Sequence, residues 1–239
     1  MKTRMLTAAL SAALLMAPQA AQRNGAQRPY IAPLMRLQPV AGSATDYELL
    51  VYGDIGDSWY GESVTARSVI EQLNALDNSV TNINVRINSY GGSVSDGLAI
   101  YNVLNRHTAT KTVTIDGVAM SSASLIAMVG DTVHMPATSL LMIHAPWGGI
   151  YGNAKELRQY AEILDTYSDS MADAYVNKSG MSRADVLNLL KDGEDHYYTG
   201  AEAVAAGFAD AVDASTDAAT APDENARAAR FSQRRCATP

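Results

Sequence analysis

Short apolar runs alternate along the chain with longer stretches in which apolar residues recur every three or four positions. The first pattern is typical of buried strands and the second of amphipathic helices. The predicted strands cover residues 47–52, 83–88, 112–115, 132–135 and 139–143. The predicted helices cover residues 63–76, 96–105, 121–129, 153–178, 183–191 and 200–206, and Gly180 ends the longest of them. This alternation predicts an α/β fold with a mostly parallel sheet.

The two ends of the chain lack this pattern. Two basic residues precede an uncharged, Ala- and Leu-rich stretch, Met5–Gln22, that resembles a signal peptide, with a removable pro-segment or a frayed helix as alternatives. Residues 23–45 show little periodicity, and the residues beyond Asp213 lack an apolar stripe. We therefore expect three regions: an N-terminal signal-like or pro-segment and arm at 1–46, one globular domain at 47–213, and a disordered tail at 214–239.

Composition narrows the classes of function. The chain has 239 residues, of which 47% are hydrophobic, enough to bury the core of one enzyme-sized domain. Its net charge of −7 argues against nucleic acid as the main partner, because nucleic-acid affinity comes mostly from clustered Lys and Arg. The single cysteine, Cys236, excludes an intrachain disulfide and a multi-cysteine metal site. We expect no metal and no cofactor. We expect a cytoplasmic protein, or an exported one if residues 1–22 act as a signal peptide.

The first candidate motif is Gly117–Ser124, in which a glycine turn leads from a strand into a helix of small residues. Ser121 then lies at a helix N-terminus, where free backbone N–H groups can stabilise an oxyanion. The alternative is structural: Ser121 is a preferred N-cap residue, and the small residues after it let the helix pack closely on the sheet.

The second candidate motif, Asn88–Ser93, contains the glycine pair Gly91 and Gly92 at another junction between a strand and a helix. Paired glycines permit positive φ values and close approach of the backbone to a ligand, although a tight turn alone would also explain them. The motif lacks the Lys and Ser/Thr of a phosphate-binding loop and the third glycine of a dinucleotide fingerprint. We do not expect this chain to hydrolyse ATP itself.

A histidine and an acidic segment complete the candidate set. His144 ends an apolar strand, and ligand sites of α/β sheets gather at the carboxyl ends of strands. His107, His134 and His196 are interpreted as structural. Asp195 stands in an acidic stretch before an aromatic pair, where an acid is by default solvated.

A hydroxyl nucleophile needs a base, a carboxylate that orients the base, and donors for the developing oxyanion. Separate loops of this chain offer all of these groups. The order Ser, His, Asp differs from the common hydrolase orders, so order alone does not certify a triad.

Taken together, four segments resemble the Clp protease proteolytic subunit and, more closely, the Clp-like head-maturation proteases of tailed phages. The likeness covers residues 47–213. The matching segments are 87–94, 117–124, 142–144 and 195–210.

The resemblance implies a serine endopeptidase with Ser121 as nucleophile, His144 as general base and Asp195 as the acid that orients it. It places the oxyanion donors at the backbone N–H groups of Gly91 or Gly92 and of Ser122. It also implies a crotonase-like spiral of ββα units, with the helix near 153–178 as a handle between two stacked homo-oligomeric rings.

The implied substrates are unfolded or flexible protein segments. The implied partner is an AAA+ unfoldase in Clp-like proteolysis, or capsid and scaffold proteins in phage prohead maturation. Tyr90 stands where the bacterial subunit usually has proline, and Ser122 and Ala123 stand where it has Met and Gly. The segment Met5–Gln22 has no counterpart in the family, and dependence on an ATPase stays open.

Two alternatives from other classes also stay open. The chain could be a non-catalytic structural subunit of a Clp-like ring. It could instead be a crotonase-type acyl-CoA enzyme, which shares the spiral fold and a backbone oxyanion site.

Overall fold

The structure is a computed structural model that describes residues 31–57, 63–77 and 79–213. The strands are β1 (Leu34–Pro39), β2 (Asp46–Tyr52), β3 (Asn82–Ser89), β4 (Thr110–Met120), β5 (Thr132–Pro136), β6 (Leu140–His144), β7 (Asp195–Thr199) and β8 (Ala211–Asp213). The helices are α1 (Ala66–Asn74), α2 (Val94–Arg106), α3 (Ser122–Ala127), α4 (Ala154–Ser179), α5 (Arg183–Leu189) and α6 (Gly200–Ala205). This arrangement confirms the predicted α/β class.

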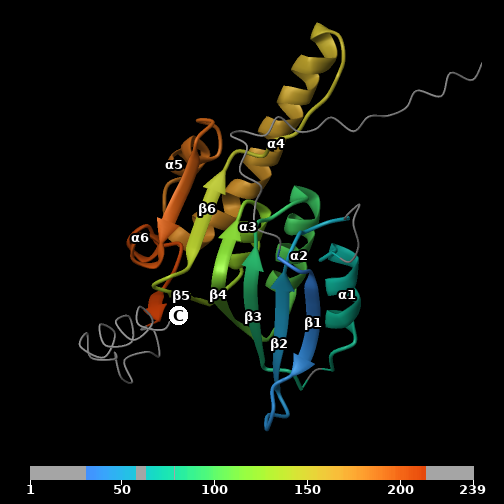
Figure 1. Ribbon diagram of the computed structural model, residues 1–239, viewed down its shortest axis with the longest axis vertical. Helices are drawn as coiled ribbons and strands as arrows, with labels where there is room; N and C mark the ends of the chain where they lie inside the picture. The colour runs from blue at the N-terminus through green and yellow to red at the C-terminus, as the bar shows by residue number, and fades with distance from the viewer. Residues whose placement is uncertain (1–30, 58–62, 78, 214–239) are drawn as a thin grey trace, which may run out of the picture.

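The strands described form one sheet with the order β1-β2-β3-β4-β5-β8, to which β6 and β7 are added (Figure 1). Pairs from β2 to β5 are parallel, and β1 runs antiparallel to β2. The long strand β4 divides one edge between two partners: Thr112–Thr114 pairs with β5, and Val118–Met120 pairs with β6. Strand β7 then pairs antiparallel with β6.

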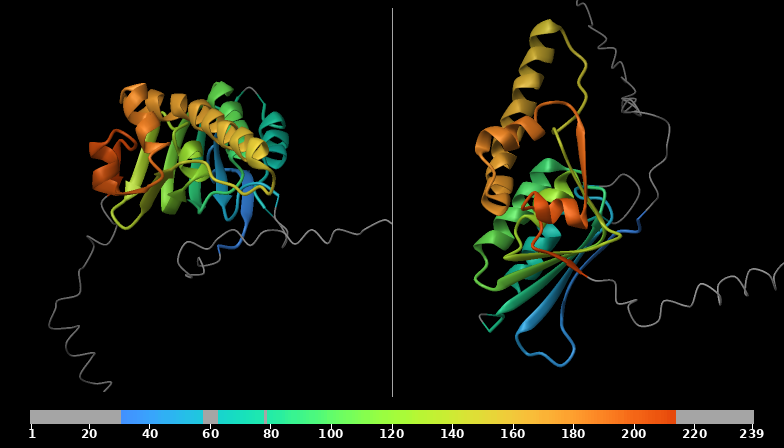
Figure 2. Two further views of the ribbon diagram at one scale, coloured as in Figure 1. Left: turned by 90° about the horizontal axis from the view of Figure 1, so that it is seen from above. Right: turned by 90° about the vertical axis from the view of Figure 1, so that its left-hand side faces the viewer.

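The core lies between the sheet and the helices that cover one of its faces (Figure 2). Along β3, burial alternates strictly, with Ile83, Val85 and Ile87 fully buried. This period of two is the pattern of a strand with one face against a core. Each such side chain contributes about 1.5–3 kcal/mol to stability when it leaves water.

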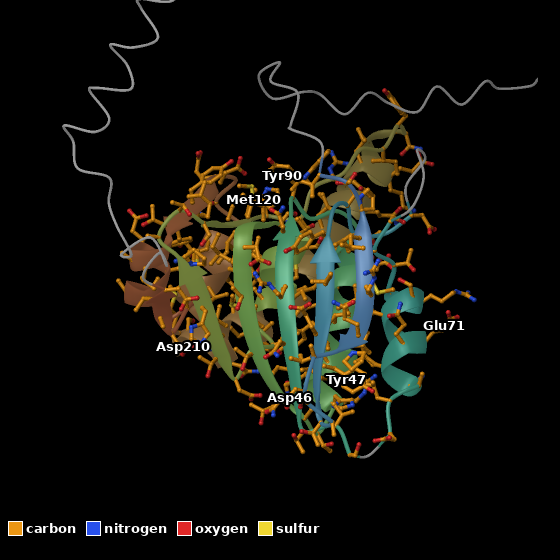
Figure 3. The ribbon with its side chains drawn as sticks, turned by 60° about the horizontal axis from the view of Figure 1, so that its bottom comes forward. Asp46, Tyr47, Glu71, Tyr90, Met120 and Asp210 are labelled. Carbon is orange, nitrogen blue, oxygen red and sulfur yellow. The ribbon has the colours of Figure 1, made fainter. Side chains whose placement is uncertain are left out.

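The opposite face of the sheet carries no helix in the described part of the chain and is lined by polar side chains (Figure 3). Asp116 of β4 forms an ion pair there with Arg86 of β3 and accepts a hydrogen bond of 2.6 Å from the Tyr52 hydroxyl of β2. Burial and the Asp116 carboxylate raise the pKa of Tyr52 to about 12, so this hydroxyl stays protonated at neutral pH. The network ties three neighbouring strands together.

Helix α4 is the longest element and extends well beyond the sheet (Figure 1). It begins with a capping box formed by Asn153 and Glu156, whose side chains satisfy three free backbone N–H groups at its start. It ends at Gly180, which has the left-handed φ of 71° that a helix C-terminus favours, as the sequence predicts.

The structure differs from the sequence-based prediction in the strands. Residues 34–39 form β1, although the sequence predicts an arm without regular structure at 23–45. Strand β4 continues through Gly117, where the sequence predicts a glycine turn. Strands β7 and β8 were not predicted. Residues 1–30 and 214–239, which include the signal-like segment and the predicted tail, lie outside the described residues.

Candidate active site

The candidate residues meet at the end of the sheet where the parallel strands terminate. Figure 3 shows Tyr90 and Met120 close together at this end, with Asp46 and Tyr47 at the opposite end. Strand β3 leads into the Gly91-Gly92 loop, β4 leads into Ser121, and β6 ends at His144. The carboxyl edge of a parallel sheet is where α/β proteins place their ligand sites.

Ser121 has a strained backbone. Its φ is 55° and its ψ −129°, and among the described residues it is the one non-glycine with positive φ. Such a conformation costs about 1–3 kcal/mol and persists only where the surroundings impose it. Ser121 does occupy the N-cap position of α3, but its side chain makes no capping hydrogen bond. A role as N-cap residue therefore does not explain where the Ser121 side chain points.

The side chain of Ser121 contacts His144 instead. The distance from Ser121 Oγ to His144 Nε2 is 2.8 Å. The Ser121 N–H donates to the carbonyl of Met142 on β6 at 3.0 Å, which holds the serine beside the strand that carries His144. The pairing of β4 with β6 thus sets the distance between hydroxyl and imidazole.

Asp195 lies directly opposite His144 in the register of β6 and β7. Its Oδ1 is 3.1 Å from His144 Nδ1. A carboxylate only accepts hydrogen bonds, so Nδ1 is the ring nitrogen that donates to Asp195, and when the ring is neutral Nε2 accepts from the Ser121 hydroxyl. The segment that begins with Asp195 is a strand rather than a loop, and although Asp195 is exposed, its pairing with β6 aligns the carboxylate with the imidazole.

The glycine loop fits tightly against Ser121. Gly91 has a φ of 91°, and a Cβ added to it would lie 2.6 Å from Met120 O and 2.7 Å from Ser121 Cβ. Gly92 has a φ of 149°, and a Cβ there would lie 2.1 Å from Ile55 O. No other residue type fits at either position. Because the glycines carry no side chain, the backbone of this loop can lie close to Ser121.

The amide groups of this loop are not equivalent. The N–H of Gly91 donates to Ser89 Oγ at 3.0 Å, and Ser89 Oγ donates in turn to the carbonyl of Gly53 at 2.5 Å. This internal contact makes the N–H groups of Gly92 and Ser122 the better candidates for an oxyanion site. The role of Ser89 was not predicted, because its contact with Gly53 joins residues 36 positions apart.

The other three histidines have structural partners, in keeping with their interpretation from the sequence. His134 contacts Asp213 at 2.9 Å, and His196 contacts Asp192 at 3.0 Å. His107 accepts a hydrogen bond from the Ala109 N–H at 3.1 Å, and burial together with nearby Lys111 lowers the pKa of its ring.

The described residues contain neither a metal-ligand cluster nor a membrane-spanning helix. Within 31–57, 63–77 and 79–213, no three His, Cys, Asp or Glu side chains are grouped to hold a metal ion. Over the same part of the chain, no helix combines the length and apolar character needed to cross a membrane.

A hydroxyl, an imidazole and a carboxylate thus form one hydrogen-bonded row at the carboxyl edge of an α/β sheet. This fold and this arrangement of side chains are those of a serine-type hydrolase. A model of the family described as Clp protease matches residues 57–216. The chain therefore belongs to the Clp protease family.

Curated relatives support this assignment, and each is named ATP-dependent Clp protease proteolytic subunit. The protein from Ligilactobacillus salivarius (strain UCC118) is 34% identical over 172 residues, which cover 70% of this chain and 83% of that protein. The protein from Leuconostoc citreum (strain KM20) is 31% identical over 178 residues, which cover 70% and 82%. The protein from Deinococcus radiodurans is 33% identical over 156 residues, which cover 63% and 75%.

These relatives confirm the predicted resemblance to Clp proteolytic subunits, a family of serine-type peptidases. The closer likeness to phage head-maturation proteases stays a prediction. The roles of the individual site residues also stay predictions.

Proposed function

We propose that this chain is a serine endopeptidase that cleaves unfolded or flexible protein segments, with Ser121 as nucleophile, His144 as general base and Asp195 as the residue that orients the base. One observation carries the proposal: a strained serine whose hydroxyl is 2.8 Å from an imidazole that is itself 3.1 Å from a carboxylate. Strain at a single non-glycine residue, aimed at a base, is the pattern of a functional serine.

The mechanism follows from the direction of each hydrogen bond. His144 Nε2 takes the proton of Ser121 Oγ as this oxygen attacks a peptide carbonyl carbon, and Asp195 stabilises the imidazolium that forms. The N–H groups of Ser122 and Gly92 stabilise the oxyanion. The imidazolium then protonates the leaving amine, and water, activated by the same imidazole, hydrolyses the acyl-enzyme.

The biological setting we propose is proteolysis with an ATPase partner. The relatives carry the designation ATP-dependent, and this chain itself has no nucleotide-binding loop signature in its sequence. A separate AAA+ unfoldase would supply unfolded segments to the site.

Labelling with a fluorescent fluorophosphonate tests the proposed nucleophile, because only an activated serine reacts readily. We expect wild type to be labelled, and Ser121→Ala and His144→Ala to lose the label. Ser168→Ala is the matched control, since the hydroxyl of this buried serine contacts the carbonyls of Leu164 in α4 and Leu190 at the end of α5, and neither belongs to the candidate site. We expect it to be labelled like wild type.

Two other outcomes, one of labelling alone and one of labelling combined with a thermal-shift assay, would support the alternatives. Correctly assembled wild type that takes no label would indicate a non-catalytic ring subunit. A thermal shift induced by coenzyme A, together with unlabelled Ser121, would indicate a crotonase-type enzyme.

Exposed apolar side chains on α4 support the proposed assembly into stacked rings. Leu157 is 46% and Ile163 51% exposed on the part of the helix that extends beyond the sheet, and Trp147 and Tyr151 are exposed in the preceding segment. Exposed apolar side chains on a helix that projects from the sheet are expected at a protein–protein interface.

We expect Ile163→Asp to weaken self-association at least about tenfold, because a charge would replace a buried apolar contact worth about 1.5–3 kcal/mol. Sedimentation velocity over a range of concentrations measures the change. Gln159→Asp adds the same charge at an exposed polar position of α4 and should leave assembly intact. Equal weakening by both variants would point to charge repulsion rather than loss of an apolar contact.

A further inference from the structure

The peptide group that joins Ser121 to Ser122 is held by two donors from one residue. The carbonyl of Ser121 accepts a hydrogen bond of 2.9 Å from the Ser124 N–H and one of 2.6 Å from the Ser124 hydroxyl. Turns at the start of a helix commonly supply the first bond. The second comes from a fully buried side chain that the mechanism above does not use.

The Ser124 hydroxyl has a second partner from a distant part of the chain. Its Oγ is 2.8 Å from the hydroxyl of Tyr175 on α4, and this tyrosine is 1% exposed. Ser124 has one hydroxyl proton, and a carbonyl oxygen only accepts. The proton of Ser124 therefore points to Ser121 O, and Tyr175 donates to Ser124 Oγ.

The hydrogen bonds run from Tyr175 through Ser124 to the Ser121 carbonyl, and this direction does not change at pH values near neutrality. Burial strongly raises the pKa of Tyr175, although the contact with Ser124 opposes the effect, so the phenol keeps the proton that it donates. Consecutive hydrogen bonds polarise one another in a buried environment. The Ser121 carbonyl is thus the final acceptor of an ordered row of donors.

A peptide group is planar and trans, so its carbonyl and its N–H point in opposite directions. Fixing the carbonyl of Ser121 therefore fixes the N–H of Ser122. This amide nitrogen lies beside the glycine loop, since a Cβ on Gly91 would be 3.0 Å from it. On the other side of the serine, the Ser121 N–H is held by Met142 O at 3.0 Å. Both peptide groups that flank the strained residue are thereby fixed.

We propose that Tyr175 and Ser124 are positioning residues that orient and polarise the Ser122 N–H as an oxyanion donor. The proposal rests on the proposed peptidase function of Ser121. It gives the C-terminal half of α4 a role in catalysis through Tyr175, although no side chain of this helix belongs to the proposed triad.

The ring of Tyr175 is itself anchored toward the other side of the site. It packs edge-on against Phe208 with ring centroids 6.1 Å apart, and Phe208 packs against Tyr198 at 5.2 Å. Tyr198 belongs to β7, the strand that begins with Asp195. The tyrosine ring is therefore packed in a cluster that includes a residue of the strand carrying Asp195.

Steady-state hydrolysis of a fluorogenic peptide by the assembled full-length protein tests the proposal. We expect Ser124→Ala to lower kcat about tenfold with KM unchanged, the rate equivalent of one hydrogen bond. Tyr175→Phe should lower kcat by about threefold, because it removes only the polarising donor. The double variant should be no slower than Ser124→Ala, since Tyr175 acts through Ser124. If kcat of the double variant fell by the product of the two single losses, Tyr175 would not act through Ser124, and the proposal would be wrong.

Stability separates positioning from a merely structural role. Ser124→Ala leaves the buried Tyr175 hydroxyl without its acceptor and should lower Tm, whereas the double variant removes both groups and should recover part of that loss. If kcat recovers together with Tm, the hydroxyl pair is structural and the proposal is wrong. We expect Tm to recover and kcat to stay low.

Ser139→Ala is the matched control. Its N–H and hydroxyl both donate to the carbonyl three residues earlier, at 2.9 and 2.8 Å, which is the geometry of Ser124. It lies before β6, at the end of that strand away from His144. We expect kcat of Ser139→Ala to equal that of wild type.

Amide hydrogen exchange of residues 121–125, followed by mass spectrometry, reports the positioning contact without catalysis. We expect faster exchange in Ser124→Ala than in Ser139→Ala. If the wild type were inactive but exchange were still faster in Ser124→Ala than in Ser139→Ala, the peptidase function would be contradicted and the positioning contact would stand. Unchanged exchange in Ser124→Ala would contradict the positioning role, whether or not the wild type is active.

Discussion

Alanine at Ser121 is expected to lower kcat for peptide hydrolysis by at least about 10⁴-fold, and alanine at His144 by a similar factor. The two residues act as one unit, because the hydroxyl is a weak nucleophile until the imidazole at 2.8 Å accepts its proton. The double variant should therefore be no slower than either single variant. Reactions quenched after long incubation, with the peptide products separated by chromatography, measure the residual rates.

The same series contains its own checks. KM should change little, since neither side chain forms the peptide-binding surface in this mechanism. Asp195→Asn should lie between wild type and His144→Ala, because an amide N–H facing Nδ1 favours the wrong tautomer but leaves the serine in place. A Ser121→Ala protein that keeps more than about 1% of the wild-type kcat, after removal of contaminating proteases, would show that another group is the nucleophile.

Alanine at Gly91 has the second largest expected effect, a loss of about 10²–10³-fold in kcat, comparable to removal of an oxyanion donor. The added methyl group would lie 2.6 Å from Met120 O and 2.7 Å from Ser121 Cβ, both on the turn that carries the nucleophile. Either the turn or the glycine loop must move. Each movement separates the backbone amides from the position of the oxyanion.

Gly42→Ala is the control for this prediction. Gly42 has a similar φ of 82°, but a Cβ there meets no atom within 4 Å. It therefore shares the conformational cost of alanine at positive φ without the contact with the site. We expect a lower Tm and wild-type kcat in Gly42→Ala. Equal losses of kcat in the two variants would mean that general destabilisation, not the oxyanion site, explains Gly91.

The periodicity of the chain predicts most of the fold because the central strands and the helices bury one continuous face. Strand β3 and the C-terminal half of helix α4, which buries Met171 and Tyr175, are clear in the sequence for this reason. Strand β1 is not, since its six residues end in proline and none is fully buried. Strand β7 was missed because its short polar sequence gains its structure from pairing with β6, a contact distant in sequence.

The candidate site could be predicted as a set of residues but not as a geometry. Ser121 and His144 stand in local motifs at strand ends, where the sequence is informative. The positive φ of Ser121 has no local signal, because one of the contacts that hold its backbone comes from Met142, on a separate strand. The contact between Ser124 and Tyr175 joins residues 51 positions apart, and both were interpreted only as parts of helices.

Strand β1 has a consequence for the limits of the folding unit. The match to the family begins at residue 57, yet β1 and β2, at 34–52, supply two neighbouring strands of the sheet. A chain trimmed to the start of the match would leave the N–H and C=O groups along one side of β3 without partners. Unprotected strand edges of this kind recruit other chains and lead to aggregation. We therefore expect a stable folding unit of this protein to include β1 and β2, upstream of the family boundary.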